Sequence, residues 1–353
     1  MENSYFKGRG SQINTSNRYF KNSYSNEHIE GLDEVLLSHE KTKFFEEAPK
    51  KIVNKVSSPD AGMMYSLNPY QGCEHGCIYC YARNSHQYWG YSAGLDFERK
   101  IIIKHNAPDL LEKQFLSKNW KPFPITISGN TDCYQPIEQK LKLTRSLLEV
   151  FLKYKNPVSI ITKNSLILRD LDILSKLAKL QLVHVMISIT SLNENLRLKM
   201  EPRTATYQNR LKTIEELHKA GVPVGVMAAP IIPGLNSKDI PSIIENAAKK
   251  GAQRAGYTIV RLNDAVHDIF KDWVYKNFPD AADKIMQQIM ECHGGKTNDS
   301  RFGKRMSGEG QIAMAINKLF KISVKKHIVN ESNFEFNLHS FNRNNTPGQL
   351  ELF

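Results

Sequence analysis

Residues 63–83 read MMYSLNPYQGCEHGCIYCYAR, a short apolar run followed at once by a loop with three of the chain's five cysteines. The run 63–67 predicts a buried strand, and Cys73, Cys77 and Cys80 follow it with C-x3-C-x2-C spacing. In a (β/α) barrel, the loop after a strand lies at the mouth where such barrels place their chemistry. The sequence therefore predicts a metal-binding or catalytic loop at the mouth of an α/β fold.

Apolar runs that predict parallel strands alternate with helical patterns through the middle of the chain. Besides 63–67, the predicted strands are 125–128, 158–162, 183–190, 222–228 and 257–262. Apolar residues recur at helical spacing in 139–155, 168–180, 207–220 and 237–250. This alternation predicts the α/β class, as a partial (β/α)6 TIM-like barrel with N- and C-terminal extensions.

Changes in composition divide the chain into four predicted regions. Residues 1–60 are polar and predict an extension with little regular structure, before the barrel at 61–262. Residues 263–336 predict a C-terminal helical region, with helices at 264–277, 281–292 and 310–320. Residues 337–353 are rich in asparagine and predict a flexible tail.

The charge and hydropathy of the chain limit which kinds of partner and which cellular compartment we expect. The 353 residues include 48 Lys and Arg against 36 Asp and Glu, a formal net charge of +12. Such a surface attracts polyanions, although a generally basic protein without such a partner has the same balance. No run approaches the ~20 apolar residues that cross a bilayer, and the start MENSYFKGRG lacks the apolar stretch of a secretory signal. We therefore expect a cytoplasmic protein with no membrane partner.

The cysteine cluster allows two kinds of metal site. Clustered cysteines in a cytosolic protein indicate metal binding or catalysis rather than a disulfide framework. A [4Fe–4S] cluster normally takes four Cys ligands, and only three are local here, so one iron would be open to another ligand. The alternative is a structural zinc site with His75 or His86 as the fourth ligand, because structural zinc requires four closed tetrahedral ligands.

The cysteine motif, with the aromatic Tyr79 before its last cysteine, resembles the signature of the radical S-adenosylmethionine (SAM) superfamily. The resemblance spans about residues 65–262. It implies an enzyme whose [4Fe–4S] cluster is held by Cys73, Cys77 and Cys80, with SAM bound to the open iron. One-electron reduction, from a donor such as flavodoxin or ferredoxin, then cleaves SAM to methionine and a 5′-deoxyadenosyl radical. That radical abstracts hydrogen from a substrate.

The same resemblance implies a set of SAM-binding residues along the strand ends. The segment 127-ISGNTDCYQP-136 stands where the family hydrogen-bonds the SAM amino group, although the usual Gly-Gly-Glu is absent. At strand ends the family also contacts the ribose, and an arginine can pair with the SAM carboxylate. The implied cofactor-binding residues are Tyr79, Gly129, Asn130, Thr131, Asp132, Ser188, Thr190, Glu201 and Arg203.

Three motifs point to one branch of the superfamily. Tyr-Cys-Tyr-Ala-Arg (79–83), Thr-Asp-x-Tyr-Gln-Pro (131–136) and Glu201 with Arg203, which resemble the Glu-Pro-x-Arg feature, point to the DNA-repair-photolyase-like branch related to spore photoproduct lyase. The N-terminal Lys-Gly-Arg-Gly and the segment 301–306 depart from the lyase, so its reaction does not transfer. Cys133 lies near the same strand end as the lyase's hydrogen-donating cysteine without matching it residue for residue. We therefore name Cys133 as a candidate catalytic residue that could donate hydrogen.

The two ends of the chain suggest macromolecular partners. The terminal Gln349-Leu350-Glu351-Leu352-Phe353 resembles the peptide that binds the bacterial sliding clamp. Segments 7–18 and 301–310 combine cations with glycines that could hold phosphates, although solvated loops explain them equally well. The favoured substrate is a nucleic-acid lesion or nucleotide, as in DNA repair. Modification of a peptide or small metabolite is the alternative enzyme function, and a zinc-stabilised DNA-binding adaptor is the alternative without catalysis.

Overall fold

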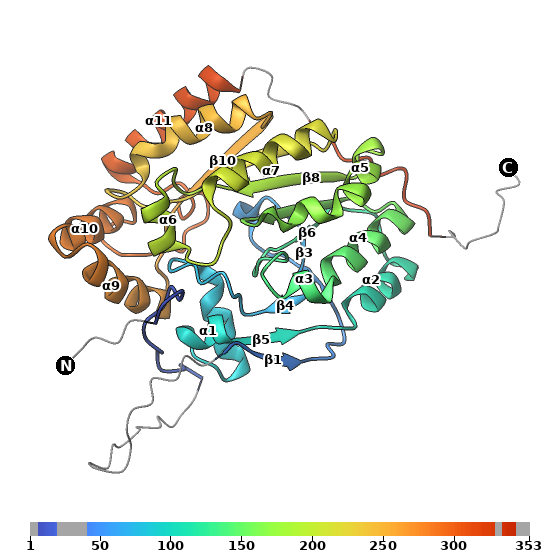
Figure 1. The fold of residues 1–353 in the computed structure, drawn as a ribbon, viewed down its shortest axis with the longest axis horizontal. Helices are drawn as coiled ribbons and strands as arrows, with labels where there is room; N and C mark the ends of the chain where they lie inside the picture. Colours follow the sequence, from blue (N-terminus) through green and yellow to red (C-terminus); the bar gives the residue numbers. More distant parts are fainter. Residues whose placement is uncertain (1–5, 20–40, 329–333, 344–353) are drawn as a thin grey trace, which may run out of the picture.

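A curved, open sheet of seven strands forms the centre of the computed structural model, which describes residues 6–19, 41–328 and 334–343 (Figure 1). The strand order is β10-β9-β8-β7-β6-β3-β2. Strand β2 is antiparallel to β3, and the other neighbouring pairs are parallel. The sheet thus confirms the predicted partial barrel of six parallel strands. The bounds are β2 (Val53–Lys55), β3 (Tyr65–Leu67), β6 (Ile125–Ile127), β7 (Val158–Thr162), β8 (Val183–Ser188), β9 (Val224–Ile231) and β10 (Arg254–Ile259).

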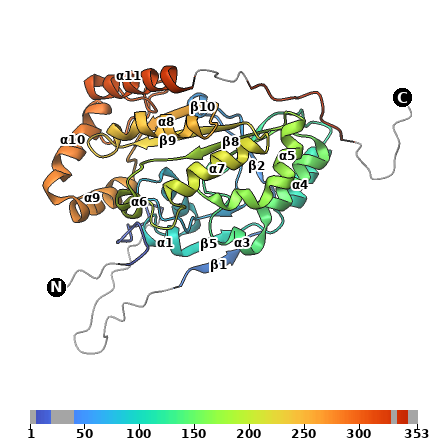
Figure 2. The same cartoon turned by 45° about the horizontal axis from the view of Figure 1, so that its top comes forward.

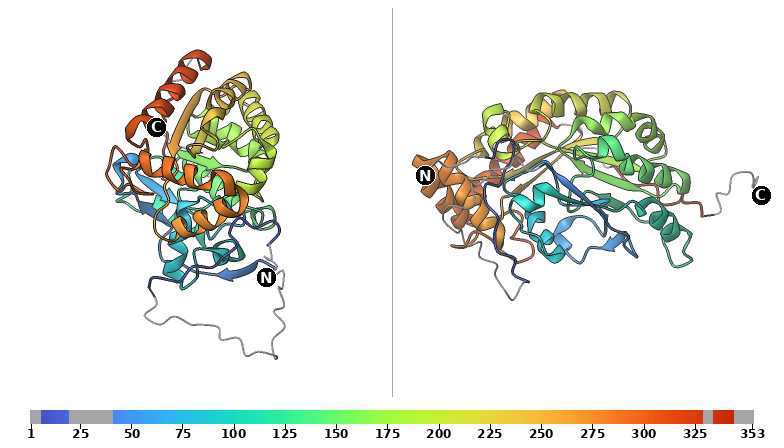
Figure 3. Two further views of the ribbon diagram at one scale, coloured as in Figure 1. Left: turned by 90° about the vertical axis from the view of Figure 1, so that its left-hand side faces the viewer. Right: turned by 60° about the horizontal axis from the view of Figure 1, so that its bottom comes forward.

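Helices arch over the outer face of this sheet, as the right-hand view of Figure 3 shows. The longer helices bury one apolar stripe; in α4, for example, Leu147, Leu148 and Phe151 are fully buried. The helices are α2 (Ala107–Leu116), α3 (Glu138–Leu141), α4 (Leu143–Tyr154), α5 (Leu171–Lys179), α6 (Glu194–Met200), α7 (Tyr207–Lys219) and α8 (Ile240–Lys249). Short 3-10 turns, η3 (Ser165–Asp170) and η4 (Ser237–Asp239), precede α5 and α8.

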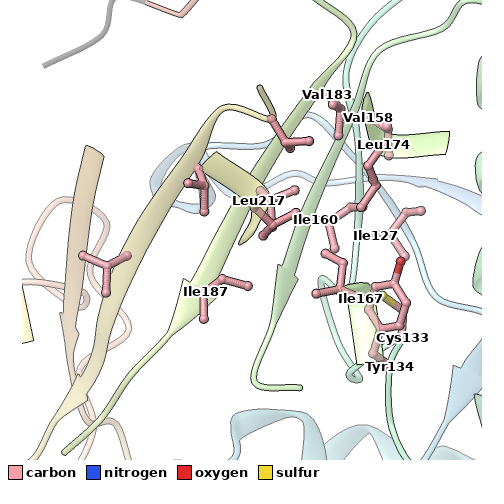
Figure 4. Close-up of a cluster of buried hydrophobic side chains, with 14 of the residues drawn as sticks. Ile127, Cys133, Tyr134, Val158, Ile160, Ile167, Leu174, Val183, Ile187 and Leu217 are labelled. Carbon is pink, nitrogen blue, oxygen red and sulfur yellow. The ribbon is translucent and has the colours of Figure 1, made fainter. Parts of the chain in front are cut away.

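The main core lies between the sheet and these helices (Figure 4). Val158 and Ile160 of β7 and Val183 of β8 have no exposed surface. They pack in one cluster with side chains of the covering helices, including Leu174 and Leu217. This burial on the helix side leaves the carboxyl ends of the strands to form the site.

Several predicted elements differ from the observed ones in their bounds, and two of these differences have a clear physical cause. The helix predicted at 139–155 is divided into α3 and α4 because Lys142 has a left-handed φ of 55°. The sixth strand was predicted at 257–262 and lies instead at Arg254–Ile259, paired with β9. As an edge strand, β10 is only partly buried over residues 254–258, so an apolar run does not mark it.

A second, three-stranded sheet joins the N-terminal region to the cysteine loop. Its order is β1 (Lys43–Glu46), β5 (Lys100–Ile103), β4 (Tyr70–Gln71), with β1 parallel to β5 and β4 antiparallel to it. The prediction of little regular structure before residue 61 is therefore wrong for β1 and β2. These strands are short and largely exposed, and they form only by pairing with later segments.

The N-terminal segment 6–19 packs against the chain that follows the cysteines. That chain comprises the 3-10 helix η2 (Tyr81–Trp89) and α1 (Leu95–Arg99). Arg83 and Glu98 are fully buried there, and the Arg83 guanidinium donates to Glu98 at 2.5 Å. The backbone N–H groups of Gly10 and Ser11 donate to the same carboxylate at 3.0 and 2.8 Å. The segment 6–19 is thus part of the folded domain.

Gly10 is required where the N-terminal segment meets the cysteine loop. A Cβ atom at this position would lie 1.7 Å from the carbonyl oxygen of Gly76. Any larger residue would therefore push the two backbones apart.

The C-terminal region adds three further helices, visible at the left and top of Figure 2. They are α9 (Ala265–Asn277), α10 (Ala282–Cys292) and α11 (Gly310–His327), with the short η5 (Pro279–Ala281) before α10. None of the helices in the described part of the chain is long and apolar enough to span a membrane.

Residues 334–343 follow the fold closely, in contrast to the flexible tail predicted from residue 337. Phe341 lies 6.0 Å from the ring of Phe115, and Arg343 donates to the carbonyls of Phe115 and Trp120 at 3.2 and 2.9 Å. The segment has no helical or strand periodicity, so its contacts could not be predicted from the sequence. The clamp-like peptide Gln349–Phe353 lies outside the described residues.

We expect Glu98→Gln to destabilise the protein because the amide cannot balance the buried Arg83 charge. Breaking a buried ion pair costs about 3–5 kcal/mol. The free energy of unfolding, measured by urea titration, should fall by that order. The control Glu245→Gln removes only a surface pair with Lys249 and should leave the free energy nearly unchanged. Equal effects of the two variants would contradict the role given to the buried pair.

Candidate functional site

The three clustered cysteines face one cavity. Cys73, Cys77 and Cys80 all line a space of about 630 Å³. Gly72 and Gly76 have left-handed φ values of 79° and 70°, which turn the loop back on itself. Cys73 and Cys77 are buried, and burial, with the nearby Glu201, raises the pKa of Cys77 to about 12. The three thiols therefore face one space, and those of Cys73 and Cys77 are shielded from solvent.

The opposite walls of the cavity are the carboxyl ends of the parallel strands. The volume is typical of pockets that bind small molecules, and the location is the one barrels use for catalysis. The strand ends contribute Ser128–Asp132 after β6, Lys163 after β7, Ser188 of β8, Met227 of β9 and the stretch 256–261 around the end of β10. The predicted residues Tyr79, Gly129, Asn130, Thr131, Asp132 and Ser188 all lie on these walls with the cysteines.

The segment 131–136 supports the cysteine loop as well as lining the cavity. Asp132 accepts a hydrogen bond from Thr162 at 2.7 Å and lies 3.4 Å from the ring of His75. Gln135 accepts from the backbone N–H of Glu74 at 3.0 Å and donates to the carbonyl of Gly72 at 3.2 Å. The motif thus fixes both sides of the turn that carries the first two cysteines.

Asp132 is negatively charged in this setting. Burial alone would raise the pKa of its carboxyl, but His75 and the backbone N–H groups of Lys163 and Tyr134 lower it to about 2. The carboxylate therefore stays ionised at neutral pH and faces the cavity.

Tyr79 belongs to a buried network behind the cysteine loop. Its hydroxyl donates to Glu201, which also accepts from Thr190 at 2.8 Å and from Arg210 at 2.5 Å. Burial alone would raise the pKa of Glu201, but the charges of Arg210 and Lys163 and the hydrogen bonds to it lower it to about 2. The structure thus places Thr190 and Glu201 behind Tyr79, and neither lines the cavity.

Arg203 also lies beside the cysteine loop rather than on the cavity wall. Its backbone N–H donates to the carbonyl of His75 at 3.3 Å, and its guanidinium lies 3.8 Å from Glu74. The Glu-Pro-x-Arg motif therefore supports the loop from outside, and its implied contact with SAM stays a prediction.

Two cations that line the cavity were missed in the sequence. Lys163 follows β7 directly, and Arg261 stands two residues beyond β10. Burial alone would lower the pKa of Lys163, but the negative charges of Cys77 and Glu201 raise it. Their positions in the sequence could have identified both residues, because the first residues beyond a barrel strand point to the mouth of the barrel.

Cys133 lies in the hydrophobic core, away from the cavity lining (Figure 4). Burial and the nearby Asp132 raise the pKa of its thiol well above its usual value. Cys292 is likewise buried in this core. The catalytic role predicted for Cys133 draws no support from this position and stays a prediction.

The site fits an iron–sulfur cluster and a small organic cofactor. In a [4Fe–4S] cluster each Cys thiolate binds its own iron, so the sulfurs face a shared space without meeting at a point. The three cysteines have this disposition, and within the described ranges no three His, Cys, Asp or Glu side chains converge on a single-ion site. Lys163 and Asp132 add both signs of charge to the same cavity.

Comparisons with known proteins agree with this geometry. Residues 67–247 match the family model of the radical SAM superfamily. An uncharacterized protein of Mycobacterium tuberculosis is 29% identical over 249 residues, which are 69% of this chain and 73% of that protein. A radical SAM Nalpha-GlyT isomerase of Pseudomonas phage M6 is 25% identical over 186 residues, 52% of this chain and 36% of that protein.

The fold is also similar to that of a solved structure. Spore photoproduct lyase complexed with dinucleoside spore photoproduct superposes with a TM-score of 0.62. The match covers 82% of this chain and 81% of that chain at 14% identity, and so concerns the fold alone. With the family match and three thiols on one cavity, the zinc-stabilised adaptor is set aside. The chain belongs to the radical SAM superfamily, whose enzymes use a [4Fe–4S] cluster to cleave S-adenosylmethionine.

Proposed function

We propose that this radical SAM enzyme abstracts hydrogen from a nucleotide unit of a nucleic acid, as a DNA repair or modification reaction. The observation that carries the proposal is the cavity itself, which is lined by the three cysteines and also by two arginines, Arg261 and Arg305. A cavity of this size and lining can hold a cofactor beside the cysteines and an anionic substrate beside the arginines. The net charge of +12 favours a polyanionic substrate.

The names of two similar proteins agree with this substrate class. The lyase structure contains a dinucleoside photoproduct, and the phage isomerase is named for Nalpha-GlyT. The motifs of residues 79–83 and 131–136 also resemble the DNA-repair-photolyase-like branch. These likenesses favour a nucleic acid over a peptide or metabolite.

Cys73, Cys77 and Cys80 would hold the cluster, and SAM would lie between them and the strand ends. When bound and reduced, the cluster supplies the electron that cleaves SAM to methionine and a 5′-deoxyadenosyl radical. Gly129, Asn130, Thr131 and Ser188 line the same cavity and would lie beside the cofactor. An electron donor such as flavodoxin or ferredoxin would reduce the cluster.

Two charged side chains match the charged groups of SAM. Lys163 lines the cavity, and its ammonium lies 6.0 Å from the ring centroid of Tyr79, which precedes the last cluster cysteine, so we assign it to the SAM carboxylate. The ionised Asp132 favours the SAM amino group. In this proposal Lys163 has the role that the family resemblance implies for Arg203.

Replacing any one cluster cysteine by alanine should remove the iron. Cys73→Ala, Cys77→Ala and Cys80→Ala should each fail to retain about four irons per chain after anaerobic reconstitution, and should lose absorbance near ~400 nm. Cys133→Ala and Cys292→Ala are the matched controls, because neither thiol lines the cavity, and both should retain the iron. Full iron content in a cluster variant would contradict the assignment.

Lys163→Met should weaken SAM binding because a charge-assisted hydrogen bond is lost. Such bonds contribute about 1.5–3 kcal/mol, or roughly a ten- to hundredfold change in Kd. Equilibrium dialysis of labelled SAM against the reconstituted protein measures it. Lys219→Met, an exposed lysine of α7 paired with Glu215, is the control. Unchanged SAM affinity at unchanged iron content would contradict the role of Lys163.

The substrate class is tested by hydrogen transfer. Reconstituted enzyme, SAM and dithionite are incubated with DNA made from fully deuterated nucleotides, either native or ultraviolet-irradiated. We expect deuterium in 5′-deoxyadenosine, detected by mass spectrometry, and none with protonated DNA. Unlabelled 5′-deoxyadenosine in every reaction would contradict the nucleic-acid substrate and favour the peptide or metabolite. No 5′-deoxyadenosine at all would contradict the radical chemistry.

A further inference from the structure

The open side of the partial barrel is crossed by side chains rather than by backbone pairing. Strands β10 and β2 are the two edges of the seven-stranded sheet. Between β2 and β3, Asp60 accepts from the backbone N–H of Gly303 at 3.0 Å and pairs with Arg305 at 2.9 Å. Arg305 also donates to Ser58. We call these four residues, Ser58, Asp60, Gly303 and Arg305, the edge bridge.

The acidic groups around the edge bridge are already paired. Asp60 is held by Arg305 and Gly303, as described above. Asp299 accepts from Arg301 at 2.6 Å, and Glu309 accepts from Arg301 at 2.5 Å and from Lys304 at 2.7 Å. None of these carboxylates lies within ion-pair distance of Arg261.

Arg261 is the cation that this neighbourhood leaves without a partner. It lines the cavity, is half-buried, and makes no hydrogen bond or ion pair with any residue in 6–19, 41–328 or 334–343. Burial and the neighbouring Arg305 lower its pKa, so its charged form is disfavoured by both. A guanidinium withdrawn from water in this way gains most from an incoming anion.

The surroundings of Arg261 differ from those of Lys163. The charged or titratable groups that act on Lys163 are Cys77, Glu201, Arg210 and Asp132. Those that act on Arg261 are Arg305, Tyr81, Asp60 and Asp299. Arg261 therefore belongs to the neighbourhood of the edge bridge, which contains Asp60 and Arg305.

The wall beside Arg261 is largely apolar. Met63, Tyr257, Ile259 and Met306 line the same cavity as Arg261 and Arg305, and the carbonyl of Met306, next to Arg305 in the chain, accepts from the backbone N–H of Ile259 at 2.8 Å. A planar guanidinium binds phosphate through two parallel hydrogen bonds, and the apolar wall accommodates a base or sugar next to it. This pairing of features matches a nucleotide better than a free inorganic anion.

We propose that Arg261, with Arg305 beside it, binds a phosphodiester of the substrate at the open side of the cavity. This inference rests on the proposed function and specifies it: the substrate is a phosphate-bearing nucleotide unit rather than a free nucleoside or base. Arg261 is then a substrate-positioning residue, separate from the residues that face the cofactor.

The test compares a phosphodiester with its uncharged counterpart. The probes are thymidylyl-(3′,5′)-thymidine and the same dinucleoside joined by a methylphosphonate. Each is titrated by calorimetry into reconstituted holoenzyme with SAM, without reductant, at fixed ionic strength. The variants are Arg261→Met, Arg261→Lys and the control Arg254→Met, which lies at the far end of β10 and does not line the cavity. Iron content and SAM affinity are measured for every variant.

The wild type and Arg254→Met should bind the phosphodiester roughly tenfold or more tightly than the methylphosphonate, the size of one charged hydrogen bond. Arg261→Met should lose this preference, and Arg261→Lys should keep part of it. If the wild type shows no preference, or Arg261→Met keeps it, the phosphate site is overturned and the nucleotide substrate still stands. If Arg261→Met loses SAM affinity, Arg261 belongs to the cofactor and the inference fails. If the wild type binds neither probe, the phosphate site and the nucleotide substrate fail together.

Discussion

The cysteine loop depends on one buried ion pair, between Arg83 and Glu98. Arg83 also donates to the carbonyls of Cys77 and Gly94 at 3.0 and 2.9 Å, so a single guanidinium fixes the backbone at the second cysteine. Glu98 in turn accepts from the N-terminal segment at Gly10 and Ser11. Both side chains are fully buried, and a buried charge is tolerated only with such complete pairing. The pair thus couples the loop, the segment 6–19 and the smaller sheet into one unit.

Other parts of the chain secure the loop from the remaining sides. Gln135 fixes its first turn, the Glu201 network holds Tyr79, and the backbone N–H of Ile78 donates to the carbonyl of Met200 at 3.0 Å. These contacts come from segments up to 122 residues away in the sequence. The three thiols are therefore positioned before any cofactor binds, which lowers the entropic cost of forming the site.

The sequence predicted the barrel and the cysteine loop well because both rest on local patterns. The apolar run at 158–162 and the C-x3-C-x2-C spacing are visible without knowledge of the fold. The predictions from the sequence were less accurate where the role of a residue depends on partners far away in the chain. Thr190 and Glu201 look like cavity residues from their positions after a strand, yet they meet Tyr79 and Arg210 behind the loop. Arg261 was missed for the same reason, since only the folded chain shows that neighbouring carboxylates are paired elsewhere.

Because of the edge bridge, the contacts that hold the partial barrel together differ between its open side and its sheet. Between neighbouring strands, separation would break a ladder of backbone hydrogen bonds, such as the five-residue register of β7 and β8. Beyond the edge strands β2 and β10, the edge bridge joins the loops that carry Asp60 and Arg305 through one ion pair and a few accompanying hydrogen bonds. Parting these two loops would therefore break fewer hydrogen bonds than separating two neighbouring strands of the sheet.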